Sequence, residues 1–220
     1  SKIARVQQNV NTEGENYFSV DVNAFKQPLA NANSKLSSLP GIFVEFPNAN
    51  GEVEKFQVWE NSNMTPDFQA LFPEIRAYVG KGITTPGSTI NFSVSPLGIQ
   101  TILFRPNGET EFMEAYDKAA TLYVVYDSKN RVKKPFNCST PNEQLELELL
   151  NSAAIASKSS AGSYKTMRLA LSCTAEYSNY FGATSSANVS LVVAAMNATM
   201  TRVNGVMEKD LARHLNMINN

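Results

Sequence analysis

Hydrophobic and polar residues follow a strand-like pattern in short runs between residues 17 and 127. Residues 17–22 alternate with the period of two that a half-buried strand requires. Further strand-like runs occupy residues 42–46, 53–59, 75–79, 90–94, 99–104, 110–116 and 122–126. Asn-Gly pairs at 50–51 and 107–108 favour tight hairpin turns between neighbouring runs. The pattern therefore predicts one antiparallel β unit.

One short helix is expected inside this β unit. Thr65 stands at the N-cap position and Pro66 at the first helical position, where its missing N–H costs nothing. Pro73 is expected to end the helix.

The pattern changes after Asp127. A polar, basic stretch without periodicity leads to residues 140–143, which have capping-box spacing before a run of Leu and Glu and so predict a helix. Residues 152–163 are rich in Ser and Ala, a composition typical of an exposed linker that proteases cut. Residues 141–165 are therefore assigned to a helix and a cleavable linker.

The C-terminal third predicts a strand, a helix and a second strand. Residues 167–173 resemble a strand, and apolar residues recur at helical spacing from 185 to 203. Asn204-Gly205 is expected to stop the helix, with Gly205 in the left-handed C-terminal position, and residues 206–218 to return as a strand. A parallel strand pair needs further elements to cover its faces, so this unit reads as the opening of a domain that is cut short. The expected class is α+β, with a mainly antiparallel β domain over residues 1–140 and this unit over 166–220.

Composition narrows the function classes. The 220 residues carry 19 Lys and Arg against 20 Asp and Glu, so there is no basic excess for nucleic acid or an anionic membrane. One His and two Cys cannot supply a His-rich zinc site, and the HExxH signature needs two His. The chain alone is therefore not expected to be a complete hydrolase. It contains no membrane-spanning stretch and begins without a signal peptide, which we expect to have been removed.

Several segments resemble one family. Residues 167–177 (MRLALSCTAEY) and 199–211 (TMTRVNGVMEKDL) are similar to the start of the catalytic domain of reprolysin (adamalysin)-like zinc metalloproteases, a metzincin group, in their secreted Bacteroidetes-type form. Residues 56–60, 64–66, 72–83 and 95–98 resemble the pro-regions of the same precursors. Together these similarities span roughly residues 15 to 220, in the order that a precursor would have.

The resemblance implies a secreted or extracytoplasmic precursor of a zinc metalloendopeptidase. The chain would contribute the pro-domain, which keeps the protease latent and assists its folding, and the first elements of the catalytic domain. Its partner would be the catalytic domain of the same precursor. The zinc motif of the family, HExxHxxGxxH, would lie beyond Asn220, so the resemblance implies no catalytic residue and no bound zinc in this chain.

Cys138 is the candidate latency residue. Related precursors use a pro-region thiolate to occupy the open coordination position of the catalytic zinc, and a thiolate binds zinc tightly. Lys133 and Lys134 would favour the thiolate form. Two alternatives stay open, namely a disulfide with Cys173 or an unused thiol, because Cys138 lacks the neighbouring glycine of better-known switch sequences.

Other residues have both a possible functional role and a simpler structural one. Lys158 and Lys165 are candidate activation cleavage sites, although a lysine without that role in a solvated linker would look the same in the sequence. His214, the only histidine, is expected to be a surface or packed residue rather than a metal ligand. The aromatic residues Trp59, Phe43, Phe46 and Tyr78 suit a sugar-binding platform, but core positions or cross-strand pairs are commoner. The carboxylates Glu109, Glu111, Glu114 and Asp117 suggest a glycosidase site, but a solvated hairpin face is the expected explanation.

A second function class competes with the precursor. The β-rich body and its aromatic residues also fit a stand-alone extracellular binding or adhesion module. That alternative leaves the incomplete strand–helix–strand without a role.

Overall fold

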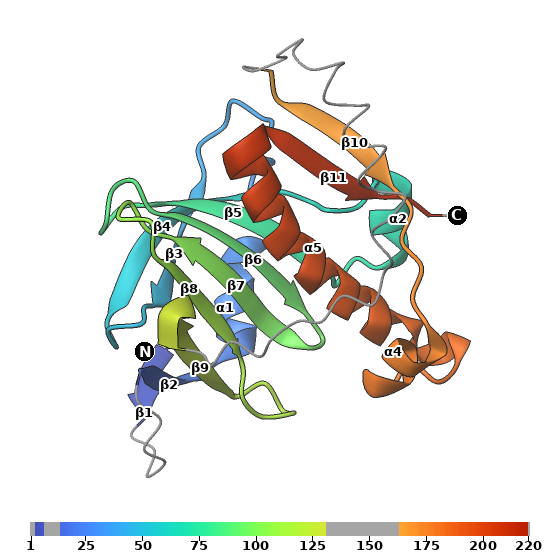
Figure 1. The fold of residues 1–220 in the computed structure, drawn as a ribbon, viewed down its shortest axis with the longest axis horizontal. Coiled ribbons are helices and arrows are strands. Elements are labelled where there is room, and N and C mark those ends of the chain that lie inside the picture. The colour runs from blue at the N-terminus through green and yellow to red at the C-terminus, as the bar shows by residue number, and fades with distance from the viewer. Residues whose placement is uncertain (1–2, 7–13, 131–162, 220) are drawn as a thin grey trace, which may run out of the picture.

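The computed structural model describes residues 3–6, 14–130 and 163–219. Their main feature is a nine-stranded sheet in the order β1-β2-β9-β8-β7-β6-β5-β4-β3, in which every neighbouring pair is antiparallel (Figure 1). Strands β3 to β9 follow one another as a meander, and β2 and β1 extend the sheet beyond β9. The strands are β1 Ile3–Val6, β2 Glu15–Val20, β3 Ile42–Pro47, β4 Val53–Glu60, β5 Arg76–Gly82, β6 Thr89–Ser95, β7 Gly98–Phe104, β8 Thr110–Ala115 and β9 Leu122–Asp127.

The sheet curls so far that its two ends meet. The side-chain amide of Asn16, on β2, donates to the carbonyl of Ala49, in the turn between β3 and β4, over 2.6 Å. The inner face encloses an aromatic and aliphatic core that includes Phe18, Phe56 and Phe92, all fully buried. Burial of such side chains is the main favourable term in folding, which explains why alternation is so regular in this half of the chain.

Helix α1 (Val22–Leu29) packs against the inner face of the sheet and was not expected from the sequence. Asp21 caps it, because its Oδ1 accepts a hydrogen bond from the Ala24 N–H at 3.0 Å. Phe25 and Leu29, four residues apart, are both buried, and the Phe25 ring lies 5.2 Å from the ring of Phe46. Strand β2 therefore ends at Val20, and the chain leaves the sheet to enter helix α1 at Val22.

The other expected elements of the β unit are confirmed. Every run in residues 42–126 forms a strand, with ends shifted by at most three residues. Helix α2 (Pro66–Leu71) has Thr65 as its N-cap and Phe72 as its C-cap, immediately before Pro73. The α+β class with a dominant antiparallel sheet is therefore confirmed.

The C-terminal part forms a strand, a helix and a strand. Strand β10 (Lys165–Leu169) and strand β11 (Arg213–Met217) pair in parallel, and helix α5 (Val189–Leu211) connects them after the short helix α4 (Ala175–Tyr180). Figure 1 shows α5 running across the outer face of the large sheet, where it contacts β5, β6 and β7. Among the described residues, no helix is long and apolar enough to cross a membrane.

The expected helix stop at Asn204-Gly205 is wrong. Helix α5 continues for six residues beyond Gly205, and its left-handed C-cap is Ala212. A Cβ atom at Gly205 would lie 2.9 Å from Asn91 Nδ2 and 3.2 Å from Phe104 Cε2. The glycine is therefore a site of close approach between helix and sheet, which is the other common reason for a glycine in a helix.

Candidate functional site

A continuous seam joins the large sheet to the β10–α5–β11 unit. Its apolar part combines side chains from the loop after β4 and from α5 and β11, and the fully or nearly fully buried members are Met64, Ile75, Val193, Ala194, Met200 and Met217. Main-chain hydrogen bonds extend the contact, since Thr65 N–H donates to the Met217 carbonyl at 3.0 Å and Met217 N–H to the Asn63 carbonyl at 2.7 Å. Residues 63–65 of the β unit therefore pair with the edge of the small parallel sheet.

A cluster of buried polar side chains lies at the centre of the seam. Asn63, from the β unit, donates from Nδ2 to Asn197 Oδ1 at 3.0 Å and to Thr201 Oγ1 at 2.8 Å. Asn204 Nδ2 donates to Asn63 Oδ1 at 2.9 Å, and Asn204 Oδ1 accepts the Leu215 N–H at 2.8 Å. All four polar side chains are at most 3% exposed. Buried amides with matched partners specify one relative position of the two units, since any shift would leave them unpaired.

Glu208 is the second polar centre of the seam. Its carboxylate accepts hydrogen bonds from Asn61 Nδ2 and Tyr164 OH, both at 2.9 Å, from His214 Nδ1 at 2.6 Å, and from the Lys35 ammonium. Burial alone would raise the pKa of Glu208, but the hydrogen bonds from His214, Asn61 and Lys35 outweigh it and lower the pKa to about 2. Burial and the Glu208 charge raise the pKa of Tyr164 well above its usual range.

His214 is a packed residue, 3% exposed, held between the two units. Its Nδ1 faces the Glu208 carboxylate at 2.6 Å and its Nε2 faces the Ser62 carbonyl at 2.9 Å. Each ring nitrogen therefore faces an acceptor oxygen, one on each side of the seam. Both nitrogens are thereby occupied. Within the described part of the chain, no group of three or more His, Cys, Asp or Glu side chains is placed to hold a metal ion.

The sequence-derived cleavage and latency residues fall in different places. Cys138 and Lys158 lie outside the described residues. Lys165 is the exposed first residue of β10, and its N–H donates to the Ala212 carbonyl at 3.0 Å. Cys173, the other partner of the possible disulfide, carries a free and exposed thiol.

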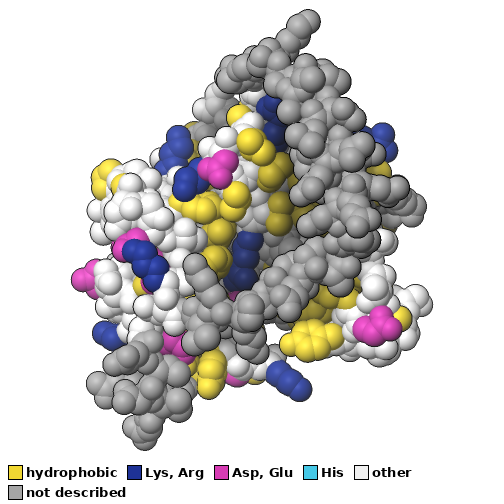
Figure 2. Space-filling model, viewed as in Figure 1, with side chains coloured by type: hydrophobic (Ala, Val, Ile, Leu, Met, Phe, Trp, Pro, Cys, Tyr) yellow, Lys and Arg dark blue, Asp and Glu magenta, His cyan; other side chains and the backbone are white. Residues whose placement is uncertain are grey.

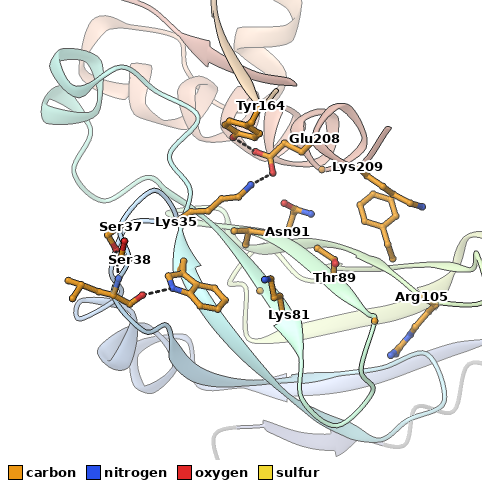
Figure 3. Close-up of a pocket in the computed structure, with 17 residues that line it drawn as sticks. Lys35, Ser37, Ser38, Lys81, Thr89, Asn91, Arg105, Tyr164, Glu208 and Lys209 are labelled. Carbon is orange, nitrogen blue, oxygen red and sulfur yellow. Dashed lines mark hydrogen bonds and ion pairs between the residues drawn. The ribbon is translucent and has the colours of Figure 1, made fainter. Parts of the chain in front are cut away.

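A cleft of about 760 Å³ opens beside the seam (Figure 3). Its floor is the outer face of β4 to β7, including Trp59, Lys81, Asn91 and Phe104, and its walls include Glu208 and the loop after α1. The four residues of the suggested aromatic platform do not come together: Phe46 and Tyr78 are in the core, Phe43 is exposed elsewhere, and Trp59 alone of the four lines the cleft. Figure 2 shows that hydrophobic side chains and Lys and Arg side chains are neighbours on this side of the molecule.

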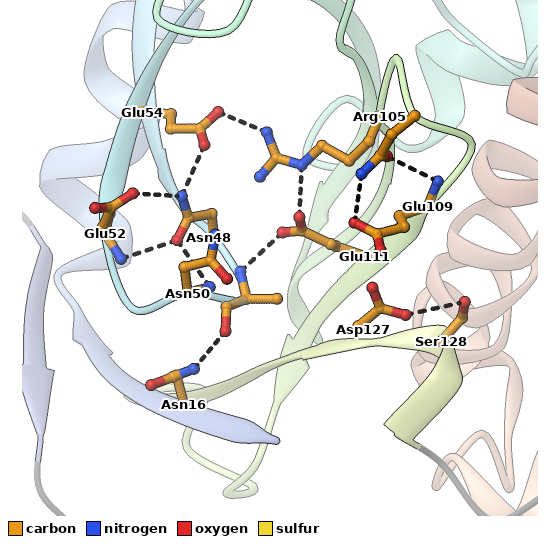
Figure 4. A network of polar contacts seen from close by, with 12 residues as sticks. Asn16, Asn48, Asn50, Glu52, Glu54, Arg105, Glu109, Glu111, Asp127 and Ser128 are labelled. Carbon is orange, nitrogen blue, oxygen red and sulfur yellow. Dashed lines mark hydrogen bonds and ion pairs between the residues drawn. The ribbon is translucent and has the colours of Figure 1, made fainter.

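Arg105 joins two carboxylates at one end of the curled sheet (Figure 4). Its Nη1 lies 2.8 Å from Glu54 Oε2 and its Nε lies 2.5 Å from Glu111 Oε1, and all three side chains are at most 8% exposed. Glu111 therefore does not lie on a solvated hairpin face as expected. Burial opposes charge on Glu54, but hydrogen bonds from Arg105 and Asn48 outweigh it, and the pKa of Glu54 is lowered. Arg105 therefore holds the two buried carboxylates together and offsets one of their two charges.

The comparisons with known proteins gave no match: no family model, no curated protein and no solved structure is similar to the chain. Function is therefore argued from the seam and the cleft.

The sequence analysis missed Lys35, Asn61, Tyr164 and Glu208, because they are distant in sequence and meet only in the fold. One signal was available. Asn197, Thr201 and Asn204 recur at spacings of four and three residues, so they form a polar stripe on the same helix whose apolar stripe was recognised.

Proposed function

We propose that residues 1–140 are the pro-region of a secreted zinc metalloprotease precursor. In this proposal the β unit folds against the first elements of the catalytic domain, residues 166–220, and holds them in a latent arrangement. The observation that carries the proposal is the seam. The buried amides of α5 find their partners on the β unit, through Asn63, and so does the carboxylate of Glu208, through Lys35 and Asn61.

The seam supports a role in folding. A pair of parallel strands with one helix is too small to bury its own apolar surface. Here the large sheet covers α5, and the main chain of residues 63–65 pairs with the edge of β11. A catalytic domain that began with this unit would gain a template for its first strand, helix and strand.

The seam also bears on how latency would end. Cleavage at Lys158 or Lys165 would cut only the covalent connection, because the contacts of Asn63 and Glu208 are non-covalent. We therefore expect the two pieces to stay together after cleavage until the seam opens or the pro-region is degraded. Catalytic zinc, which activates water in such enzymes, would be held by residues outside the described ones. Cys138 remains the candidate thiolate ligand for that zinc in the latent state.

The test uses the full precursor, expressed from the coding sequence that continues past the codon for Asn220. We expect an HExxHxxGxxH motif downstream, peptidase activity that is low before linker cleavage, and a rise in activity when the pro-region is removed. Cys138→Ser should raise the activity of the uncut precursor if the thiolate contributes, whereas the control Cys173→Ser should not. A precursor that is fully active without cleavage, or a reading frame without the motif, refutes the proposal.

A further inference from the structure

The cleft beside the seam has a charge surplus that the proposed function does not use. Among the described residues, four cationic side chains line it, and Glu208 is the only carboxylate that does. Lys35 is paired with Glu208 and Arg105 with its own carboxylates. Within the described part of the chain, Lys81 and Lys209 have no carboxylate partner, and their ammonium groups lie 5.8 Å from the ring of Trp59 and 4.6 Å from the ring of Phe104. The surplus favours an anionic ligand.

Asn91 also offers an amide to the cleft. Asn91 is 3% exposed and lines the cleft, yet its side chain makes no hydrogen bond to any described residue (Figure 3). Its amide borders the cleft, where it can donate to or accept from a bound ligand. Gly205 of α5 approaches the same amide closely, since a Cβ there would lie 2.9 Å from Asn91 Nδ2.

The remaining lining residues suit a ring with hydroxyl groups. Trp59 offers an aromatic surface, and its indole N–H donates to the Leu39 carbonyl at 3.0 Å, which fixes the ring. Ser37, Ser38 and Thr89 add neutral hydroxyls. A volume of about 760 Å³ falls within the range of about 300–1,000 Å³ typical of small-ligand sites.

We propose that this cleft binds an acidic oligosaccharide. A sugar ring packs on Trp59, its carboxylates face Lys81 and Lys209, and a hydroxyl bonds to the amide of Asn91. The cleft contains residues of both units, so the bound saccharide also stabilises the seam. The proposal rests on the geometry of the cleft and does not require the protease.

The test is titration of the full chain with tetragalacturonate, followed by calorimetry and by fluorescence of Trp59, the only tryptophan in the chain. Cellotetraose, which is neutral, is expected to bind at least about tenfold more weakly, because it lacks the charge-assisted hydrogen bonds. Lys81→Gln and Lys209→Gln should each weaken tetragalacturonate binding by about tenfold. Lys118→Gln, which removes an exposed lysine away from the cleft, should not.

Three results would overturn the proposal. They are no binding of tetragalacturonate at millimolar concentration, equal affinity for the acidic and neutral sugars, and tighter binding of ATP, which would identify a nucleotide site. Unchanged affinity in both cleft lysine variants would also contradict it, because the two side chains are exposed at the surface and their replacement should leave the fold intact.

Discussion

Replacing Asn63 by Ala tests whether the two units form one cooperative structure. Asn63 is 2% exposed and is the only side chain of the β unit in the cluster with Asn197, Thr201 and Asn204. In the variant, Asn197 Oδ1 loses its donor and becomes a buried, unpaired acceptor. Thr201 keeps its hydrogen bond to the Asn197 carbonyl at 2.8 Å, and Asn204 keeps its bond to the Leu215 carbonyl at 2.9 Å.

The expected loss of stability follows from the hydrogen bonds that disappear. One orphaned buried acceptor costs about 1–3 kcal/mol, and loss of the remaining hydrogen bonds and of side-chain volume adds to it. We expect the free energy of unfolding to fall by about 2–4 kcal/mol. Asn63→Asp should cost more at neutral pH, because a carboxylate oxygen would face the Asn197 carbonyl oxygens.

The assay is urea unfolding of the full chain, followed both by Trp59 fluorescence and by far-UV circular dichroism. In the wild type the two signals should give one transition, since Trp59 belongs to the β unit and α5 to the other. Asn31→Ala, at an exposed position, is the matched control and should change stability by less than about 0.5 kcal/mol. A loss below that limit in Asn63→Ala, or two separate wild-type transitions, would refute a cooperative seam.

Three further outcomes are expected. The pKa of Glu208 is lowered from 4.5 to about 2, so its contribution to stability is complete above pH 4.5 and is lost as the pH falls toward 2. Glu208→Gln should flatten that part of the stability–pH curve measured by thermal unfolding. Arg105→Met leaves Glu54 and Glu111 buried without a cation and should cost about 3–5 kcal/mol in urea unfolding. The exposed pair of Lys129 and Glu109 is the control, and Lys129→Met should leave the urea midpoint almost unchanged. Gly205→Val forces α5 away from Asn91 and Phe104 and should cost about 1–3 kcal/mol, visible as a lower melting temperature.

The elements of the β unit were predictable because local pattern decides them. Residues 90–94 alternate, and their apolar side chains point into the core of the curled sheet, while α5 covers and buries the opposite face of β6 and β7. Helix α1 was not predicted because it is short and contains Pro28. Its buried residues Phe25 and Leu29 form no recognisable pattern in the sequence, and only the fold shows that Phe25 packs on Phe46 and Phe92.

The candidate site could not be predicted to the same extent. Lys35 and Glu208 are 173 residues apart, and nothing in the chain between them indicates that they pair. Gly205 illustrates the same limit, since a glycine near the end of a helical pattern indicates a C-cap by local rules and a close approach only when the partner surface is known. Secondary structure can be predicted from the local sequence, whereas long-range polar contacts can be identified only once the sheet has formed.

The polar stripe on α5 is the strongest argument that the two units evolved to fold together. Had α5 been a helix of an independent unit, its buried face would be expected to be apolar, because each buried amide needs a partner. Instead Asn197 and Asn204 are 1% exposed and depend on Asn63, which lies on the opposite unit. Removing the β unit would expose an apolar face and leave the side-chain amide of Asn197 without its partners, Asn63 and the Arg76 carbonyl. The β10–α5–β11 unit therefore requires either this partner or another surface with amide groups in the same positions.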